Sequence, residues 1–346
     1  MYAIVLLLSL MMLTGCRQDD TMERFDAAFT CRRTIVTQEC KVSDLVLGRP
    51  FFMSYADSCV LLYDDLGDSL FTLIDMADSR RVYRFGERGQ GPSEFLQVAS
   101  VHRLPSGFCV YDYHRHRLVR IDIKKVKSGV NDFSVLMNDT IRSIDMLPTA
   151  YGTYVGLGFY EKNMFSVLKD GVWSYFSEYP SQDETERRIP NALRGMAYQG
   201  TLCASPALDK LVYAVNFSPI FMIYTVGEDS LVKTHEWIGA YPIYQPVEKN
   251  GSRSAPMSSR NRMGFISTYA TDRYVYLLYS GKSLQEHREK ALTGNVIYQL
   301  DWDGRPVARL ELDVQLSQFC VTDADDRIYA VRNEEECTLI ELSLDE

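Results

Sequence analysis

The stretch FGERGQGPSEFLQVASVHRLPSGFCVYDYHRHRLVRID, residues 85–122, decides the fold of this chain. It starts with three glycines, Gly86, Gly89 and Gly91, which are followed directly by Pro92. Glycine reaches positive φ without steric cost and the proline ring fixes φ, so the chain turns here and is neither a helix nor the interior of a strand. The stretch therefore begins with a tight loop that visits positive φ.

Two β-rich runs follow this loop. A Pro-Ser-Gly turn at residues 105–107 precedes the run FCVY at 108–111, and a charged tip at 114–117 separates it from the alternating run at 118–123. Aromatic and β-branched residues between turn residues are typical of strands. Turn, strand, tip and strand together predict one antiparallel β unit.

This unit resembles a propeller repeat of the NHL type, and the resemblance covers residues 85–123. The positions that carry it are Phe85, Gly86, Phe95, Gly107, Asp112 and Arg117. In that family the aspartate and the arginine are usually a structural pair that ties the hairpin together. The resemblance therefore implies that Asp112 and Arg117 belong to the scaffold, and it assigns no ligand.

Similar strand pairs recur along the chain at spacings of roughly 45 to 65 residues, the range of propeller blades. Several of them begin after a turn that contains aspartate. The first runs lie at residues 59–63, 108–111, 154–159, 210–215, 273–279 and 327–331, and the second at 70–75, 118–123, 165–168, 221–226, 296–301 and 338–342. Six units predict an all-β fold, a six-bladed β-propeller whose four-stranded antiparallel blades bury one another's faces.

The last unit ends at Glu346 with too little chain for a complete blade. A propeller has to close its ring, because an open ring leaves the apolar faces of two blades exposed to solvent. We therefore expect a strand near Thr34 to Val42 to complete the final blade. Residues 31–346 then form a single propeller, and the one helix we expect lies in a loop insertion around Ser283 to Ala291.

Residues 1–16, MYAIVLLLSLMMLTGC, are apolar over about a dozen positions, fewer than the ~20 of a membrane-spanning helix. They end in small residues before a cysteine, as a signal peptide does. Leu13-Thr14-Gly15-Cys16 resembles a bacterial lipobox, which implies that Cys16 is lipidated and becomes the N-terminal residue. The alternative is an ordinary secretory signal in which the cysteine has no role.

Residues 17–30 are expected to form an acidic tether between the lipid and the propeller. The first four, Arg17-Gln18-Asp19-Asp20, resemble the surface-export signal that follows the lipidated cysteine in Bacteroidota lipoproteins. Most short charge runs are simply solvated, so an inert tether is the alternative. The expected location is the outer membrane, either on the cell surface or in the periplasmic leaflet.

Over nearly the entire mature chain the sequence resembles the TolB-like six-bladed β-propeller lipoproteins of Bacteroidota. The segments that carry the resemblance are LGRP at residues 47–50, LFTLIDM at 70–76, FGERGQGPSEF at 85–95 and YVYLLYSGK at 274–282. The resemblance is weakest between residues 130 and 200. It implies a propeller and a membrane anchor, with no reaction or ligand to transfer.

The charge balance argues against nucleic acid as a partner, because phosphates require a basic surface. Acidic residues number 46 against 37 lysines and arginines, and the formal net charge is −9.

Seven of the eight cysteines remain after Cys16. An exported protein can form disulfides, and Cys31 and Cys40 are the nearest two, but spacing does not determine the pairing. Cys59, Cys109 and Cys320 lie beside β-branched or aromatic runs, so we expect them to be small buried hydrophobic residues.

The sequence contains no contiguous catalytic motif. The glycines at 86, 89 and 91 lack the lysine of a phosphate-binding loop, and neither GxSxG nor HExxH occurs. His114 and His116 have the spacing of two metal ligands on one strand face, but arginines flank them in a hairpin tip. Acidic clusters at residues 64–65, 323–326 and 334–336 lack the spacing of a calcium loop and are expected to be turns. No metal site and no cofactor are expected.

The aromatic residues are the remaining candidates for binding. Trp173, Trp237 and Trp302, with the 22 tyrosines, offer stacking surfaces for sugars or peptides, and the alternative is packing between blades. The leading hypothesis is a noncatalytic binding or scaffolding lipoprotein of the envelope that holds a protein, peptide or glycan. The alternative is a propeller enzyme, a lyase or hydrolase with a metal in the central channel, because separate loops build such a site without a contiguous motif.

Overall fold

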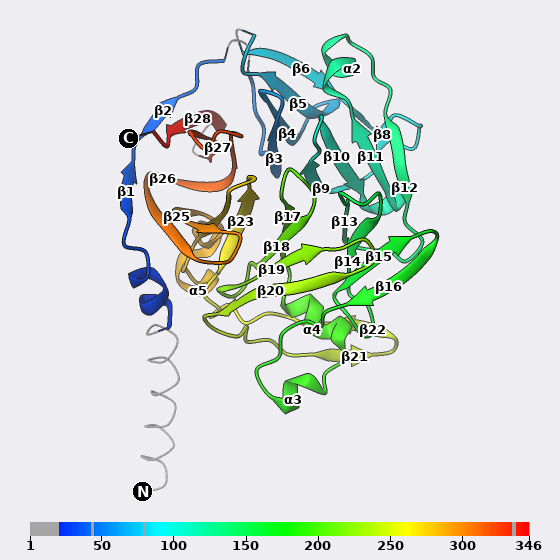
Figure 1. Ribbon diagram of the computed structural model, residues 1–346, viewed down its shortest axis with the longest axis vertical. Coiled ribbons are helices and arrows are strands. Elements are labelled where there is room, and N and C mark those ends of the chain that lie inside the picture. Colours follow the sequence, from blue (N-terminus) through cyan, green and yellow to red (C-terminus); the bar gives the residue numbers. More distant parts are fainter. Residues whose placement is uncertain (1–20, 43–44, 79, 334–336, 346) are drawn as a thin grey trace, which may run out of the picture.

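The computed structural model describes residues 21–42, 45–78, 80–333 and 337–345. Antiparallel sheets stand in sequence order around a common centre, and they make a six-bladed β-propeller, as predicted (Figure 1). In every blade the two runs expected from the repeats are the second and third strands.

Each blade starts at the centre of the ring, and its strands follow one another outward. Blade 1 contains β3 (Phe52–Ala56), β4 (Cys59–Leu66), β5 (Ser69–Asp75) and β6 (Arg81–Phe85). Blade 2 contains β9 (Val98–Arg103), β10 (Phe108–Asp112), β11 (Arg117–Ile121) and β12 (Ser134–Asn138). Blade 3 contains β13 (Asp145–Pro148), β14 (Tyr154–Leu157), β15 (Phe165–Lys169) and β16 (Val172–Phe176). Blade 4 contains β17 (Gly200–Ala204), β18 (Lys210–Val215), β19 (Ile220–Val226) and β20 (Leu231–Ile238). Blade 5 contains β23 (Phe265–Ala270), β24 (Tyr274–Tyr279), β25 (Gly294–Asp301) and the first part of β26 (Pro306–Val321), and blade 6 contains the rest of β26, β27 (Arg327–Asn333), β28 (Cys337–Ser343) and β2 (Thr37–Glu39).

β26 is 16 residues long and joins two blades without a loop. Its first part pairs with β25 from Pro306 to Glu311, its last part pairs with β27 from Phe319 to Val321, and Leu316 between them is opposite both Gly294 and Arg332. Both pairings change register around Leu316, which is the mark of a β-bulge, and a bulge bends a strand. The strand thereby passes from the outer edge of blade 5 to the centre of blade 6.

The two faces of the ring carry different connections, because strand direction alternates within a blade. Turns from the first to the second strand and from the third to the fourth lie on one face, which we call the turn face. Turns from the second to the third strand and connections between blades lie on the other, the linker face. The linker face carries residues 177–199, with α3 (Glu184–Arg187) and α4 (Asn191–Ala197), and residues 239–264, with β21 (Val247–Lys249) and β22 (Ser252–Ser254).

The middle strands are buried on both sides, because a neighbouring blade covers each face. β10 is buried at all five positions, and β18 is buried at five of its six. Strands buried on both faces read as continuous apolar runs in the sequence rather than as alternating ones. Cys59 and Cys109 are fully buried in second strands and Cys320 in the first strand of blade 6, so all three are buried as predicted. Among the described residues the cysteines are free thiols.

The N-terminal segment supplies outer strands to two blades. β2 pairs antiparallel with β28, with Thr37 opposite Leu342, and is the fourth strand of blade 6. β1 (Arg32–Ile35) runs parallel to β26 on the outer side of blade 5, with Arg32 opposite Arg309. A strand thus lies on the last blade within the expected range, Thr34 to Val42, and the dependence of the ring on it stays a prediction.

Residues 21–27 form a helix against the rim of the ring, within the range expected to be a tether (residues 17–30). Phe25 and Phe29 are buried between blades 4 and 5. The Phe25 ring lies 4.2 Å from the ring of Trp237 and 5.0 Å from the ring of Tyr298. Burial of the two phenylalanines stabilises this docking by about 3–6 kcal/mol. Met22, Phe25 and Phe29 form an apolar pattern of only three residues, which is too short to predict a helix.

Asp26 holds the same helix through its carboxylate. It accepts hydrogen bonds from Tyr298 Oη at 2.8 Å, Arg309 Nε at 2.7 Å and Arg32 Nη2 at 2.6 Å. Burial raises the pKa of Asp26, but the hydrogen bonds from Tyr298, Arg32 and Arg309 outweigh burial and keep the pKa below its ordinary value of 3.8.

The predicted helical insertion is present as α5 (Leu284–His287) and η2 (Arg288–Leu292). Sequence reasoning missed α2 (Ile123–Lys127), α3 and α4. These helices have 5, 4 and 7 residues, too few for an apolar period to appear.

A chain that starts at Val42 is expected to lose cooperative unfolding. The deletion removes β1, β2 and the docked helix. β26 and β28 then lose their outer partner strands, and Phe25 and Phe29 no longer fill the space between blades 4 and 5. Thermal unfolding followed by circular dichroism measures the effect, and a chain that starts at Thr21 is the control. An unchanged single transition in the shorter chain would contradict the role of these strands.

The substitution Asp26→Asn is expected to remove an acid-sensitive contribution to stability. Because the folded-state pKa of Asp26 is lowered, its carboxylate stabilises the folded chain above pH 3.8, and this stabilisation is lost as the pH falls through the folded-state value. We expect the free energy of unfolding to fall by about 1–3 kcal/mol at pH 7 and by less at pH 3. Urea unfolding at both pH values measures it, with the exposed Asp303→Asn as control. A loss of equal size at the two pH values would disprove the assignment.

Candidate functional site

The first strands of all six blades line a central cavity of about 110 Å³. In Figure 1, β3, β9, β13 and β17 lie nearest the middle of the ring. A water molecule occupies about 30 Å³ in the liquid, so the cavity suits a few waters or a ligand of a few atoms.

Three polar side chains beside the cavity meet at one carboxylate oxygen. Ser100 and His102 extend from β9, and Asp145 begins β13 in the next blade. His102 Nε2 lies 2.7 Å from Asp145 Oδ1, and the Ser100 hydroxyl donates a hydrogen bond to the same oxygen. The backbone N–H of Met146 also donates to it, at 2.6 Å. All three side chains are buried, so this cluster connects blades 2 and 3.

The order of these contacts differs from that of a nucleophilic triad. In a triad the imidazole lies between the hydroxyl and the carboxylate and takes the proton of the hydroxyl. Here the hydroxyl and the imidazole both bind Asp145. The Asp145 carboxylate thus accepts several hydrogen bonds from groups within the fold. Such a buried, fully bonded carboxylate suits a structural bridge between two blades.

Arg103, at the end of β9, forms an ion pair with Asp323 in the first turn of blade 6. Blade 1 lies between the two blades, so the pair joins them across the turn-face end of the channel. The side chain of Arg103 is 14% exposed and that of Asp323 is 51% exposed. This end of the channel is therefore partly closed by a charge pair.

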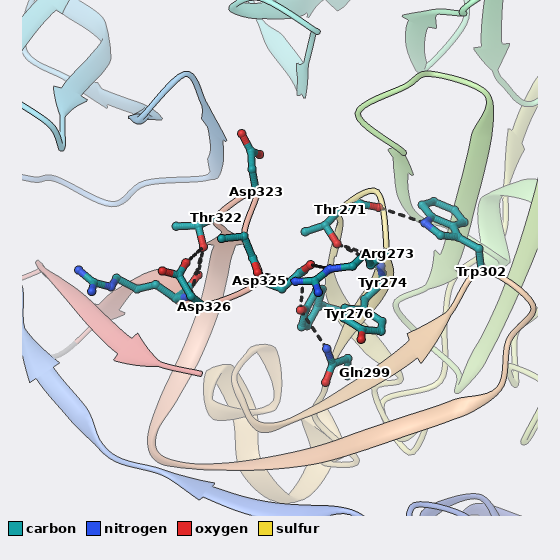
Figure 2. Close-up of polar contacts among 12 residues, drawn as sticks. Thr271, Arg273, Tyr274, Tyr276, Gln299, Trp302, Thr322, Asp323, Asp325 and Asp326 are labelled. Carbon is teal, nitrogen blue, oxygen red and sulfur yellow. Dashed lines mark hydrogen bonds and ion pairs between the residues drawn. The ribbon is translucent and has the colours of Figure 1, made fainter. Parts of the chain in front are cut away.

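Figure 2 shows the acidic turn that contains Asp323. Asp325 accepts hydrogen bonds from Tyr276 Oη and Arg273 Nε, each at 2.8 Å, and Asp326 accepts one from Thr322. The carboxylates take separate partners and lie in a turn, as predicted for residues 323–326.

Other polar groups of the channel wall also bind one another. Thr201 donates a hydrogen bond to Thr268 at 2.8 Å, and Tyr269 Oη donates to the Tyr55 carbonyl at 3.1 Å. Burial raises the pKa of Cys203 to about 12, so it is a neutral thiol at pH 7. These polar groups of the channel wall are therefore bound within the fold or, in the case of Cys203, neutral.

A larger hollow of about 650 Å³ lies on the linker face between blades 1 and 2. We call it the blade 1–2 groove. Its aromatic side consists of Phe51, Phe52 and Tyr63, and its polar side includes Arg88, Gln97 and His114. The Phe51 side chain is 48% exposed, and the Tyr63 ring lies 5.9 Å from the ring of Phe51 and 6.1 Å from that of Phe52. The groove therefore offers an exposed aromatic surface beside hydrogen-bond donors.

The Gly-rich loop that forms one side of this groove is held by Asp112 and Arg117. Asp112 accepts a hydrogen bond from the Gln97 N–H at 3.1 Å, and Arg117 Nη1 donates to the Pro92 carbonyl at 2.9 Å. The two residues are opposite each other in the β10–β11 ladder and both are buried, with 3.6 Å between Arg117 Nε and Asp112 Oδ2. They are a structural pair in this chain, and they position the loop.

Of the three glycines in the loop, only Gly86 has positive φ, at 70°. The loop therefore visits positive φ, as expected, at Gly86, whereas Gly89 and Gly91 lie outside that region. At these two positions a side chain would collide with the Glu94 carboxylate, which accepts the Gly91 N–H at 2.6 Å. The loop closes around the carboxylate of Glu94, which lies at the end of a flexible side chain and would have to move if either position carried a Cβ.

The two histidines of the hairpin tip have different places. His114 lies in η1 (Tyr113–Arg115) and lines the groove, and His116 follows in the left-handed region with φ of 49°. The part of the chain that the structure describes contains no group of three or more His, Cys, Asp or Glu side chains placed to hold a metal ion.

The tryptophans serve packing, which is the alternative interpretation of the sequence. Trp237 packs on Phe25, and Trp302 is buried and donates a hydrogen bond to the Thr271 carbonyl at 3.0 Å (Figure 2). Trp173 donates to Thr140 at 3.2 Å.

Two predicted features, Cys16 and the cluster at residues 334–336, lie outside the described residues. Within the described ranges, no helix has the length and apolar character needed to cross a membrane.

Sequence reasoning did not single out Phe51, His102 or Asp145. His102 and Asp145 are 43 residues apart, so no local pattern brings them together. The only available signal for Phe51 is its position directly after the LGRP segment and before a strand, which does not reveal exposure.

The chain matches the family described as TolB-like 6-blade propeller-like over residues 29–324. A structure of a Bacteroides fragilis protein whose name calls it exported has a TM-score of 0.55 at 12% identity, over 91% of this chain and 99% of that one. A member of the DUF4221 family from Bacteroides vulgatus has a TM-score of 0.51 at 8% identity, over 89% of this chain and 97% of that one. At these identities the likeness to the two structures shows the fold alone. A search of curated proteins finds none that matches this chain. Because the matched span covers most of the sequence and the blades are in place, the protein belongs to the TolB-like six-bladed propeller family.

Proposed function

We propose that this protein is a noncatalytic binding protein of the cell envelope, anchored by a lipid at Cys16, and that the blade 1–2 groove holds a peptide segment of a partner protein. The observation that carries the proposal is the groove itself. It is the larger of the two hollows described above, about 650 Å³ against about 110 Å³ for the channel.

The chemistry of the groove suits a peptide. Phe51 projects a half-exposed ring into it, and aromatic residues beside arginine dominate the binding energy of many protein interfaces. Arg88, Gln97 and His114 supply hydrogen-bonding groups on the other side, which match the carbonyls and N–H groups of a backbone. The rigid Asp112–Arg117 pair keeps the loop side of the groove in place, so little ordering is required on binding.

The lipid anchor is supported by the N-terminal sequence. The apolar run ends in Leu13-Thr14-Gly15-Cys16, the pattern that resembles a lipobox. The name of the similar Bacteroides fragilis protein, which calls it exported, agrees with a location in the envelope. On the outer membrane the anchored propeller would bind partners at the cell surface or in the periplasm.

Replacing Phe51 by alanine is expected to weaken partner binding at least about tenfold, as loss of a central aromatic contact does. A photo-crosslinking amino acid at position 51, in cells that contain the native membrane, first identifies the partner segment. Calorimetry with that segment as a synthetic peptide then compares the parent chain with Phe51→Ala. The matched control is Tyr151→Ala, because Tyr151 is also 48% exposed but lies on the turn face.

Equal crosslinking from positions 51 and 151, or unchanged affinity in Phe51→Ala, would rule out the groove as the binding site. Crosslinks to a glycan would support the groove as the binding site but would show that its ligand is a glycan and not a peptide. A divalent metal that copurifies with the protein and is lost in His102→Ala would favour the alternative, a propeller enzyme with a metal in its channel.

A further inference from the structure

The helix at residues 21–27 fixes the point at which the chain leaves the ring. Phe25 and Phe29 are buried between blades 4 and 5, and Met22 packs against the same cluster. Asp26 binds Tyr298 and Arg309 of blade 5. In Figure 1 this dark blue segment lies at the rim, outside β25 and β26. The route toward Cys16 therefore begins at the rim and not over the channel.

Docking of the helix shortens the reach of an N-terminal anchor. Five residue steps separate Cys16 from Thr21, and an extended chain covers about 3.6 Å per step, so the link spans at most about 18 Å. A propeller of this length is about 50 Å across. A free tether over residues 17–30 would have reached about as far as the whole width of the ring. The docked helix restricts the anchor to the sector of blades 4 and 5.

The blade 1–2 groove lies on the opposite side of the ring. In a ring of six, the boundary between blades 1 and 2 and the boundary between blades 4 and 5 are three blades apart in both directions. Figure 1 shows β3 to β12 at the top and right and the N-terminal helix at the lower left. An anchor at one boundary therefore leaves the other far from the membrane.

The charge of the turn face opposes a flat orientation on that face. Exposed carboxylates in its turns, which include Asp57, Asp78, Asp229 and Asp272, outnumber the exposed basic residues Lys124, Arg273 and Arg305. Carboxylates are repelled by the negative surface of anionic lipids. The linker face is uneven, because it carries the α3–α4 and β21–β22 insertions.

We propose that the rim of blades 4 and 5 faces the lipid surface, so that the ring stands on its edge and the blade 1–2 groove lies in the part of the linker face farthest from the membrane. This inference rests on the proposed lipid at Cys16. The bilayer is the partner of the rim, and the peptide ligand approaches from the distal side.

Energy transfer from single labelled sites to a bilayer dye tests the orientation. Val232 and Val135 are matched sites, since each is the second residue of the outermost strand of its blade, and they are 56% and 45% exposed. The lipidated full chain, with exposed Cys31 replaced by serine, carries Val232→Cys in blade 4 or Val135→Cys in blade 2. Vesicles of phosphatidylethanolamine and phosphatidylglycerol contain the acceptor. We expect transfer from position 232 to exceed that from position 135 at least about threefold, given the width of the ring.

A flexible insertion of Gly and Ser residues between Asp20 and Thr21 is the matched control, because it lengthens the link and leaves the helix docked. The insertion is expected to reduce the difference in energy transfer between positions 232 and 135. If that difference persists, the length of the link does not restrict the position of the anchor. Equal transfer from the two sites in the parent chain would overturn the orientation. Mass spectrometry of the same sample separates the two proposals: without a lipid on Cys16 the anchor itself fails, whereas with the lipid and equal transfer only the orientation fails.

Discussion

The mutual burial of blade faces is the constraint on which the rest of this structure depends. A four-stranded sheet such as blade 2 or blade 4 has an apolar middle on both sides, and only a neighbour on each side keeps both faces dry. The constraint leaves three kinds of surface for function: the mouth and wall of the channel, the loops on the two faces, and the rim. The candidate sites of this protein lie on these surfaces.

Polar side chains of the ring, buried or partly exposed, serve the contacts between its parts. The Ser100–His102–Asp145 cluster connects blades 2 and 3, and the pair Arg103–Asp323 connects blades 2 and 6. A buried charge without partners costs several kcal/mol, so each carboxylate gathers donors from a neighbouring strand or turn. The same requirement explains Asp112 and Arg117, whose bonds to backbone groups of the Gly-rich loop shape one side of the groove.

The N-terminal segment links the proposed anchor to the architecture. The same stretch of chain supplies a docked helix between blades 4 and 5, a strand on β26 and a strand on β28. Forces at the membrane would therefore act on packed elements and not on a loose tether. Because the groove lies at the opposite boundary of the ring, the proposed attachment and the proposed binding site occupy separate surfaces.

The sequence by itself determined the β class, the number of blades and the buried cysteines, because these depend on local strand patterns and on a period that repeats six times. It also indicated the Asp112–Arg117 pair, whose members are five residues apart in one hairpin. It did not reveal the helix at residues 21–27, the roles of Gly89 and Gly91, or the groove beside Phe51. The helix and the groove depend on the proximity of residues far apart in the chain: Phe25 beside Trp237, and Phe51 and His114 around one hollow. Only the closed ring brings such residues together, and so only the tertiary structure decided which aromatic residues are packed and which remain exposed.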